Sequence, residues 1–177
     1  MSAWEKTLRV ALSVLFAAAV ALCSQAFTDT SSDWFQGLTP PTLMPPFAVF
    51  PIVWGVLSVL YAVSLSIVAI RSGGSGLRPV TTDPDGMPRR PELFPKNKPT
   101  LILYLTYGVL SVLWSYTFFI LHNLTGALFV LIAIIVVTAS VISSASRISP
   151  VAAALLLPGF VWLCFALYLN YEFAFLN

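Results

Sequence analysis

Five long apolar runs organise the chain. They contain no Lys, Arg, Asp or Glu and cover residues 10–27, 47–70, 100–121, 124–145 and 151–171. A helix needs roughly 20 predominantly apolar residues, within a range of about 17–25, to cross the hydrocarbon core of a bilayer. The pattern therefore predicts five transmembrane helices, packed as an all-α bundle that forms one membrane domain over residues 1–177.

The charged residues divide between the two sides of this predicted bundle. The side opposite the N-terminus carries Asp29, Asp33 and Glu172 and no basic residue. Cytoplasmic loops are enriched in Lys and Arg, so the pattern predicts the N-terminus inside and the C-terminus outside. A multi-pass protein of a bacterial plasma membrane fits this orientation, and an organelle membrane is the alternative. The basic residues on the N-terminal side are Lys6, Arg9, Arg71, Arg78, Arg89, Arg90, Lys96, Lys98 and Arg147.

Composition supports a membrane protein. The chain has 177 residues, of which 58% are hydrophobic and 9% charged, and its mean hydropathy is +0.89. Soluble domains are about 25% charged, so a water-soluble core could not bury this much apolar surface. Membrane lipid is the expected surrounding. The net charge of +2 is too small to indicate a nucleic-acid partner.

Two stretches of the sequence allow more than one interpretation. Residues 1–26 have the basic start and apolar run of a signal peptide. Ser13, Ala17 and Ala21, spaced four apart, form a small-residue stripe suited to helix packing in lipid and favour a retained helix. Residues 71–99, rich in Gly and Pro, predict a flexible basic loop on the inside. That loop is a solvated connector or a contact for anionic headgroups.

The apolar runs lack the parts of most enzymes. They hold no carboxylate, Lys or Arg, which proton relays and ion pathways require. His122 lies at a helix end without a nearby Cys, His or carboxylate, so an interfacial residue is favoured over an axial haem ligand. Cys23 and Cys164 show no metal or redox spacing. The sequence therefore predicts no catalytic residue, no metal site, no required cofactor and no enzymatic activity.

Tryptophans mark a candidate site instead. Trp54, Trp114 and Trp162 fall at comparable depth, within roughly 10–15 Å of the outer surface at 1.5 Å per residue, and Trp34 lies in the outside loop. The spacing leaves two interpretations open, a ligand pocket or aromatic packing. Neighbours that share a helix face with the three buried tryptophans are Phe50, Ser58, Tyr61, Ser111, Phe118, Phe165 and Ala166.

Pro158 and Gly159 interrupt the last apolar run. Proline inside a helix frees a carbonyl one turn back and bends the helix. We expect a bend there, which either opens space beside Trp162 or serves only as a packing kink.

Four motifs together resemble the TspO/MBR family of tryptophan-rich sensory proteins and translocator proteins. Trp34-Phe35 followed by Leu38, Pro41 and Pro45-Pro46 resembles the family's W-Y-x-x-L-x-K-P-x-W-x-P-P loop. "FPIVW" matches the opening of the second helix, and "WSYTFF" resembles W-S-x-x-F-F in the third. "LLLPGFVWLCFALYLNYEFAFLN" resembles the closing L-I-P-Y-x-x-W-x-x-F-A-x-Y-L-N signature. The resemblance covers nearly the whole chain.

The resemblance implies a five-helix bundle, usually a homodimer. Family members bind tetrapyrroles such as protoporphyrin and haem, sterols and synthetic benzodiazepine-type ligands. Their pocket lies between helices, beneath the loop that joins the first two. The family's ligand contacts carry over to Trp34, Trp54, Trp114 and Trp162, with Ala166 one turn beyond Trp162. The proline-rich loop of this chain is then expected to be a stiff lid, with Pro45-Pro46 in the first turn of the second helix.

Several family positions are replaced in this chain. The loop's usual Lys is Pro40 and its second Trp is Leu43. Ser111 and Tyr107 stand for an Asn and a Gln in the third helix, and Gly159 stands for the Tyr after the proline. No Lys or Arg follows Tyr168 or Tyr171, so the proposed cholesterol pattern is incomplete.

Three functions follow from this resemblance. The favoured one is binding of a hydrophobic small molecule, most of all a porphyrin stacked on indole rings. Ser58, Tyr61 and Ser111 could then supply hydrogen bonds, with propionates towards the wet outer mouth. The alternatives are light- or oxidant-dependent degradation of porphyrin and a structural role in a larger membrane complex.

Overall fold

The computed structural model describes residues 2–72 and 98–177, so Arg78, Arg89, Arg90, Lys96 and most of the predicted basic loop lie outside the described residues. The described part is helical. Its elements are α1 (Ala3–Phe27), α2 (Asp33–Gln36), α3 (Val49–Ser72), α4 (Lys98–Ser115), the π-helix η2 (Tyr116–Ile120), α5 (Leu124–Ser146), α6 (Pro150–Ala154) and α7 (Leu157–Leu176).

Five segments of the described chain are long and apolar enough to cross a membrane, which confirms the predicted fold class. They are Ala3–Phe27, Val49–Arg71, Lys98–Ile120, Leu124–Ser146 and Pro150–Leu176. Each coincides with one of the predicted spans.

Several segment boundaries differ from the predicted ones, and the last span reaches Leu176 instead of residue 171. α1 begins seven residues before its apolar run because Ser2 and Glu5 form a capping box, in which each side chain accepts a hydrogen bond from the other's backbone N–H (3.2 and 3.0 Å). α3 begins at Val49 because Pro46 starts a separate turn, whose carbonyl accepts from the Val49 N–H at 2.9 Å. Pro51, and not Pro45-Pro46, occupies the first turn of α3.

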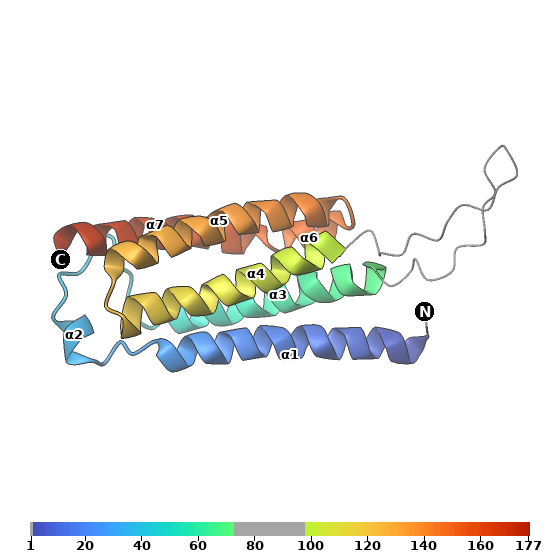
Figure 1. The fold of residues 1–177 in the computed structure, drawn as a ribbon, viewed down its shortest axis with the longest axis horizontal. Helices are drawn as coiled ribbons and strands as arrows, with labels where there is room; N and C mark the ends of the chain where they lie inside the picture. The colour runs from blue at the N-terminus through green and yellow to red at the C-terminus, as the bar shows by residue number, and fades with distance from the viewer. Residues whose placement is uncertain (1, 73–97) are drawn as a thin grey trace, which may run out of the picture.

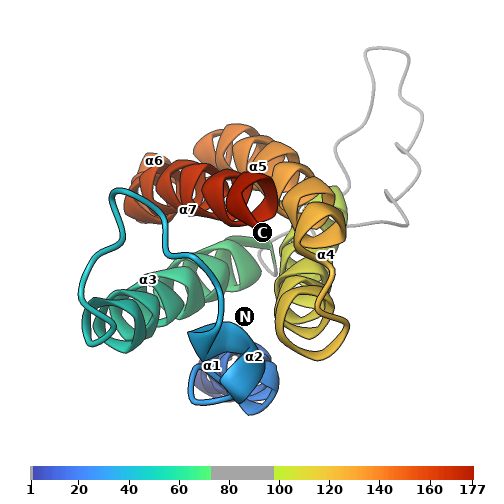
Figure 2. The ribbon, with the colours of Figure 1, turned by 90° about the vertical axis from the view of Figure 1, so that its left-hand side faces the viewer.

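The long helices lie side by side along the bundle, with the two termini at opposite ends (Figure 1). Viewed from the end that holds the C-terminus, α1 lies between α3 and α4, α5 lies next to α4, and α6 and α7 close the ring between α5 and α3 (Figure 2). We call the two ends of the bundle the N-terminal end and the C-terminal end.

Charge follows these two ends among the described residues. Lys6, Arg9, Arg71, Lys98 and Arg147 all lie at helix positions of the N-terminal end. Arg9 donates to the Ala69 carbonyl at 2.8 Å, and Arg71 donates to the Ile148 carbonyl at 3.0 Å. The acidic residues Asp29, Asp33 and Glu172 belong to the opposite end. The separation on which the predicted orientation depends is therefore present, while the orientation in a membrane stays a prediction.

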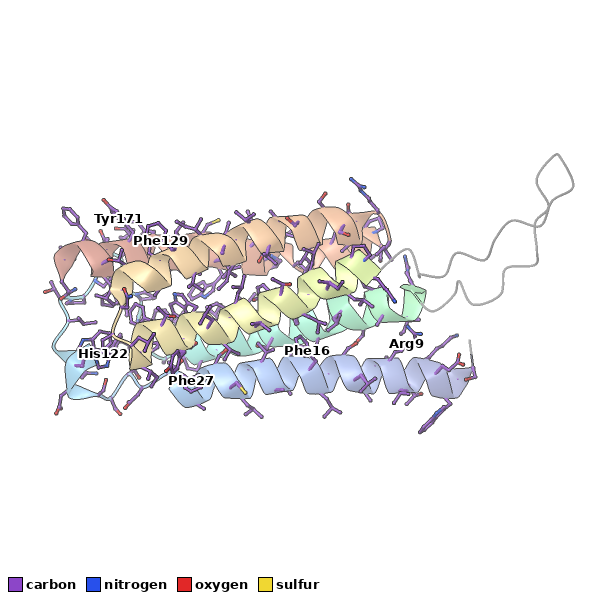
Figure 3. The ribbon with its side chains drawn as sticks, viewed as in Figure 1. Arg9, Phe16, Phe27, His122, Phe129 and Tyr171 are labelled. Carbon is purple, nitrogen blue, oxygen red and sulfur yellow. The ribbon has the colours of Figure 1, made fainter. Side chains whose placement is uncertain are left out.

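α1 packs against α4 through a glycine. A Cβ atom on Gly108 would lie 2.7 Å from Cζ of Phe16 and 2.8 Å from Cγ2 of Val20, and Phe16 lies between α1 and its neighbours (Figure 3). Ser13 and Ala17 are buried on the same helix. The small-residue stripe of the first helix is therefore used inside the bundle.

Hydroxyl groups join three helices near the N-terminal end. Ser64 on α3 donates to the Ala152 carbonyl at 2.6 Å, and its oxygen lies 2.6 Å from the Tyr104 hydroxyl. Since the Ser64 proton is engaged by a carbonyl, the Tyr104 hydroxyl donates to Ser64. Tyr61 in turn donates to the Tyr104 carbonyl at 2.6 Å. These bonds hold α3, α4 and α6 together.

The expected bend in the last span is a break between α6 and α7. It falls at Leu155 and Leu156, in the third of the span nearer the N-terminal end and not in its middle. Pro158 has no N–H to donate to the Ala154 carbonyl. The Leu156 N–H donates to Ala153 at 3.1 Å, so the Ala152 carbonyl is released from the helix and accepts from Ser64.

Candidate functional site

The α1–α3 loop (residues 28–48) covers the C-terminal end of the bundle (Figure 2). Asp29 starts it with a turn, accepting from the Ser31 hydroxyl at 2.6 Å and the Ser31 N–H at 2.9 Å. These bonds, the side-chain one first, hold the pKa of Asp29 below its ordinary value. Ser32 then caps α2 by accepting from the Phe35 N–H. The short helix α2 thereby presents Trp34 and Phe35 to the bundle.

Phe35 anchors the loop in an aromatic cluster. The residue is buried, with its ring 5.5 Å from that of Phe119 and 5.9 Å from that of Phe173. The cluster also contains Phe118 and Ala127. The loop is thus attached to η2, α5 and α7 by apolar packing.

Glu172 on α7 and Asn177, which directly follows α7, fasten the far half of the loop. The Glu172 carboxylate accepts from the Thr42 N–H at 2.7 Å and from the Tyr168 hydroxyl at 2.5 Å. Asn177 accepts from the Thr39 N–H at 2.8 Å and donates to the Thr39 carbonyl at 3.3 Å. The proline-rich loop therefore lies over the C-terminal end of the bundle.

Trp34 connects the loop to η2 and to His122, which follows η2. Its ring lies 4.0 Å from that of His122 with an interplanar angle of 10°, and 6.0 Å from that of Phe118. His122, at the C-terminal end of the bundle (Figure 3), has a φ of 52°, an uncommon conformation for a residue with a side chain. It follows η2, a kind of helix frequently found at functional sites. His122 thus acts as a stacking partner for the loop.

Trp114 is hydrogen-bonded inside the bundle. Its indole N–H donates to Oδ1 of Asn170 at 3.0 Å, and Nδ2 of Asn170 donates to the Leu124 carbonyl at 3.0 Å. Asn170 is 2% exposed. One amide side chain therefore connects α4, α5 and α7 directly beneath the loop.

Trp54 and Trp162 meet across α3 and α7. Their ring centroids are 6.5 Å apart at an interplanar angle of 86°, and the Phe50 ring lies 6.0 Å from that of Trp162. Phe165 completes the group, with its ring 5.4 Å from that of Trp162. The Trp162 indole nitrogen is enclosed and has no hydrogen-bond partner. The predicted aromatic face of the second helix therefore contacts that of the fifth.

Aliphatic side chains fill the space between Trp54 and Trp114. Leu131, Ile134 and Leu163 form a buried cluster. Trp54, Trp114 and Ala166 all pack against it. Trp54 and Trp114 thus share one apolar centre, which is occupied by protein in this conformation.

A small hollow lies beside the aromatic region. Its volume is about 20 Å³, close to the space that one water molecule needs. Tyr61, Tyr107 and Thr138 are among its lining residues, and Leu163 belongs both to this lining and to the aliphatic cluster. The remaining lining residues are Leu57, Val141, Leu155, Leu156 and Gly159.

Comparison with known proteins identifies the family. The sequence model of the TspO/MBR family matches residues 12–176. The chain belongs to the TspO/MBR family. The tryptophan-rich protein TspO of Chlorobaculum tepidum is 27% identical over 177 residues, which cover 98% of each chain. The tryptophan-rich protein TspO of Bacillus cereus is 27% identical over 144 residues, covering 81% of this chain and 80% of the relative.

The polar groups predicted for the site in this TspO/MBR member are largely engaged by its own backbone. Tyr61 donates to the Tyr104 carbonyl, and its ring is stacked on that of Tyr107 at 4.9 Å. Ser111 donates to the Tyr107 carbonyl at 2.8 Å. Ser58 is half-buried on α3. A ligand would have to compete with the helix for two of these three hydroxyl groups.

Four roles were not predicted from the sequence. They are the hydrogen bond of Asn170 to Trp114, the stacking of His122 on Trp34, and the loop contacts of Glu172 and Asn177. Asn170 carried a signal, because it is a polar amide inside an apolar run of the family's closing motif. Glu172 and Asn177 carried none, since their partners lie more than 120 positions away in the sequence. Among the described residues, no group of three or more His, Cys, Asp or Glu could hold a metal ion.

Proposed function

We propose that this member of the TspO/MBR family is an integral membrane binding protein, sensory or translocating, for flat hydrophobic ligands. Tetrapyrroles such as protoporphyrin or haem are the favoured ligands, and sterols come second. The observation that carries the proposal is the meeting of tryptophans from different elements under one loop. Trp54 contacts Trp162, Trp114 packs on the same apolar cluster as Trp54, and Trp34 is held above by α2.

Binding requires the aromatic site to open. The rings of Phe50 and Trp54 on α3 close against Trp162 on α7, and these contacts are apolar and edge-on. A flat ligand inserted there replaces edge contacts with stacked ones, which are worth about 0.5–1.5 kcal/mol per aromatic pair beyond burial. Burial of the ligand's apolar surface adds about 25 cal/mol per Å². Any anionic substituent would lie towards the loop and away from the uncharged spans.

Porphyrin titration with tryptophan fluorescence quenching tests the proposal. Trp54→Ala and Trp162→Ala are each expected to weaken protoporphyrin binding by roughly tenfold, about 1.4 kcal/mol. Trp4→Ala is the matched control, because Trp4 is 73% exposed at the opposite end of the bundle. Equal affinity in all four proteins would remove the binding site from this cluster.

A structural role is the second candidate, and one observation favours it. The space between Trp54 and Trp114 is filled by Leu131, Ile134 and Leu163, and Trp114 is engaged by Asn170. Aromatic packing of this kind would serve a partner of a larger membrane complex. This reading predicts stable copurifying proteins and no saturable binding of protoporphyrin or sterol by the purified chain.

We further propose that the protein is a homodimer with its N-terminus inside. Ile102, Leu105 and Val109 lie on one exposed apolar face of α4, which a second copy could cover. Crosslinking in membranes tests the dimer. Labelling of single cysteines placed at residue 31 or residue 147 from either side of the membrane tests the orientation, and labelling of residue 147 from outside would reverse it.

A further inference from the structure

A second hollow, which we call the α5 hollow, lies on an exposed face of α5 and shares no residue with the aromatic site. Its volume is about 630 Å³, and all its lining residues belong to α5 or follow it directly. It begins at Ile135 and Val136 and ends at Arg147, which terminates α5 at the N-terminal end of the bundle (Figure 1). The lining residues between them are Ala139, Ser140, Ser143 and Ser144.

The α5 hollow arises from small side chains at helical spacing. Its lining forms two rows at intervals of four residues, one from Ile135 to Arg147 and the other from Val136 to Ser144. Alanine and serine occupy the middle of the face, between the bulkier residues at its two ends. In the other half of α5, Phe129 is 67% exposed. The hollow is therefore confined to the half of the span nearer the N-terminal end.

The length of the α5 hollow matches one leaflet of a bilayer. Eleven residues separate Val136 from Arg147, which corresponds to about 16 Å along the helix at 1.5 Å per residue. Half of the hydrocarbon core measures about 15 Å. With Arg147 at headgroup level, where basic side chains near helix ends lie, the hollow extends to about the middle of the bilayer. An acyl chain of one leaflet has this reach.

Two hydrogen-bond donors lie at the headgroup end of the α5 hollow. Ser140 follows the usual habit of helical hydroxyl groups and donates to the Val136 carbonyl at 2.9 Å. The Ser143 hydroxyl makes no such bond within the described part of the chain. One turn further on, the guanidinium of Arg147 forms neither a hydrogen bond nor an ion pair with any described residue. A phosphodiester supplies the acceptor oxygens and the negative charge that these two donors lack.

The charges around this end of the hollow favour an anion. The C-terminal end of a helix carries about half a negative charge, which the full charge of Arg147 outweighs. α4 begins beside it, because the Thr100 hydroxyl lies 2.5 Å from that of Ser144. The positive end of the α4 dipole and Lys98 therefore lie at the same level. Among the described residues, the one acidic side chain of this end is Glu5, which caps its own helix, α1.

We propose that the α5 hollow binds one anionic phospholipid of the leaflet at the N-terminal end. The lipid phosphate accepts hydrogen bonds from Arg147 and Ser143, and one acyl chain lies over Ala139 towards Val136. A lipid fits better than a second copy of the chain, because the hollow covers one leaflet and has a cation at one end only. This site is separate from the tryptophans, so it stands or falls independently of the proposed ligand-binding function.

Native mass spectrometry of the detergent-purified full chain tests the site. Dioleoyl phosphatidylglycerol and dioleoyl phosphatidylcholine share their acyl chains and differ in net charge. The wild type should bind the first roughly fivefold more tightly, the factor for one basic residue at an anionic surface, and Arg147→Gln should bring the affinity ratio close to one. Lys6→Gln is the matched control, because it removes one exposed charge at the same end and should keep the ratio. Equal losses in both variants, or no preference in the wild type, would overturn the proposal.

Two further measurements separate a bound lipid from other occupants. Ser143→Leu places a larger side chain in the hollow and should weaken both lipids, by roughly fourfold for each CH₂ group displaced from it. Glycerophosphoglycerol and inorganic phosphate, which lack acyl chains, should not displace phosphatidylglycerol from the wild type even in large excess. Displacement by either would assign the hollow to a free anion. Unchanged lipid binding in Ser143→Leu, with loss of a dimer, would assign it to a contact between two copies. Either result overturns the proposal.

Discussion

Replacing Asn170 by leucine should destabilise the bundle through Trp114. The substitution nearly preserves volume, so a cavity contributes little. It removes two hydrogen bonds, one from Trp114 and one to the Leu124 carbonyl. Side-chain bonds between helices in a membrane average about 0.6 kcal/mol each, which gives about 1.2 kcal/mol. A buried N–H left without a partner adds about 1–3 kcal/mol. The expected loss in the free energy of unfolding is about 2–4 kcal/mol.

A double-mutant cycle shows whether this loss arises from the stranded indole. Trp114→Phe removes the donor, so in the Asn170→Leu background it should cost less than it does alone, with a coupling energy of about 1 kcal/mol or more. Unfolding of purified protein in mixed micelles, followed by far-UV circular dichroism, provides the four free energies. Additive effects, or a loss below about 0.5 kcal/mol for Asn170→Leu, would refute the reasoning.

Three further changes test other parts of the fold. Gly108→Leu should cost about 1–3 kcal/mol, because the side chain would overlap α1, whereas Gly55→Leu, with no atom within 4 Å of its Cβ position, should change the micelle unfolding free energy little. Glu172→Ala removes the acceptor for a loop amide, so hydrogen exchange over residues 39–46 should quicken by roughly fivefold, which corresponds to about 1 kcal/mol; unchanged exchange would show that the carboxylate does not hold the loop. His122→Val should lower thermal stability by about 1–2 kcal/mol relative to His122→Asn, since a β-branched residue tolerates the positive φ poorly, and equal stabilities would contradict that explanation.

The five spans could be predicted from the sequence because each depends only on the length and the lack of charge of its own run of residues. An uncharged run of sufficient length has one low-energy arrangement in lipid, so hydropathy located all five segments. The start of α1 was missed by hydropathy yet is local too, since Ser2 and Glu5 form a capping box three residues apart. The depth of Trp54, Trp114 and Trp162 followed from counting residues along each helix. In the structure, Trp54 and Trp114 pack against one apolar cluster, while Trp162 contacts Trp54.

The use of each polar group was not predictable, because it depends on partners from other helices. Pro158 predicted an interruption, but the break lies at Leu155 and Leu156, where Ser64 captures a released carbonyl. Periodicity treats Trp114 and Trp162 alike, whereas Asn170 engages only the first. The hydroxyl of Ser111 was expected to face a ligand and instead bonds to its own helix.

The bond between Ser64 and the Ala152 carbonyl has a mechanical consequence. It couples the short segment α6 to α3, and through Tyr104 to α4, while the covalent path to α7 passes through Leu155 and Leu156, where the helix is interrupted. The N-terminal third of the bundle is thus held by hydrogen bonds between α3, α4 and α6. We therefore expect any separation of the rings near the loop to bend the last span at this interruption, while the bonds of Ser64 and Tyr104 hold the N-terminal third together.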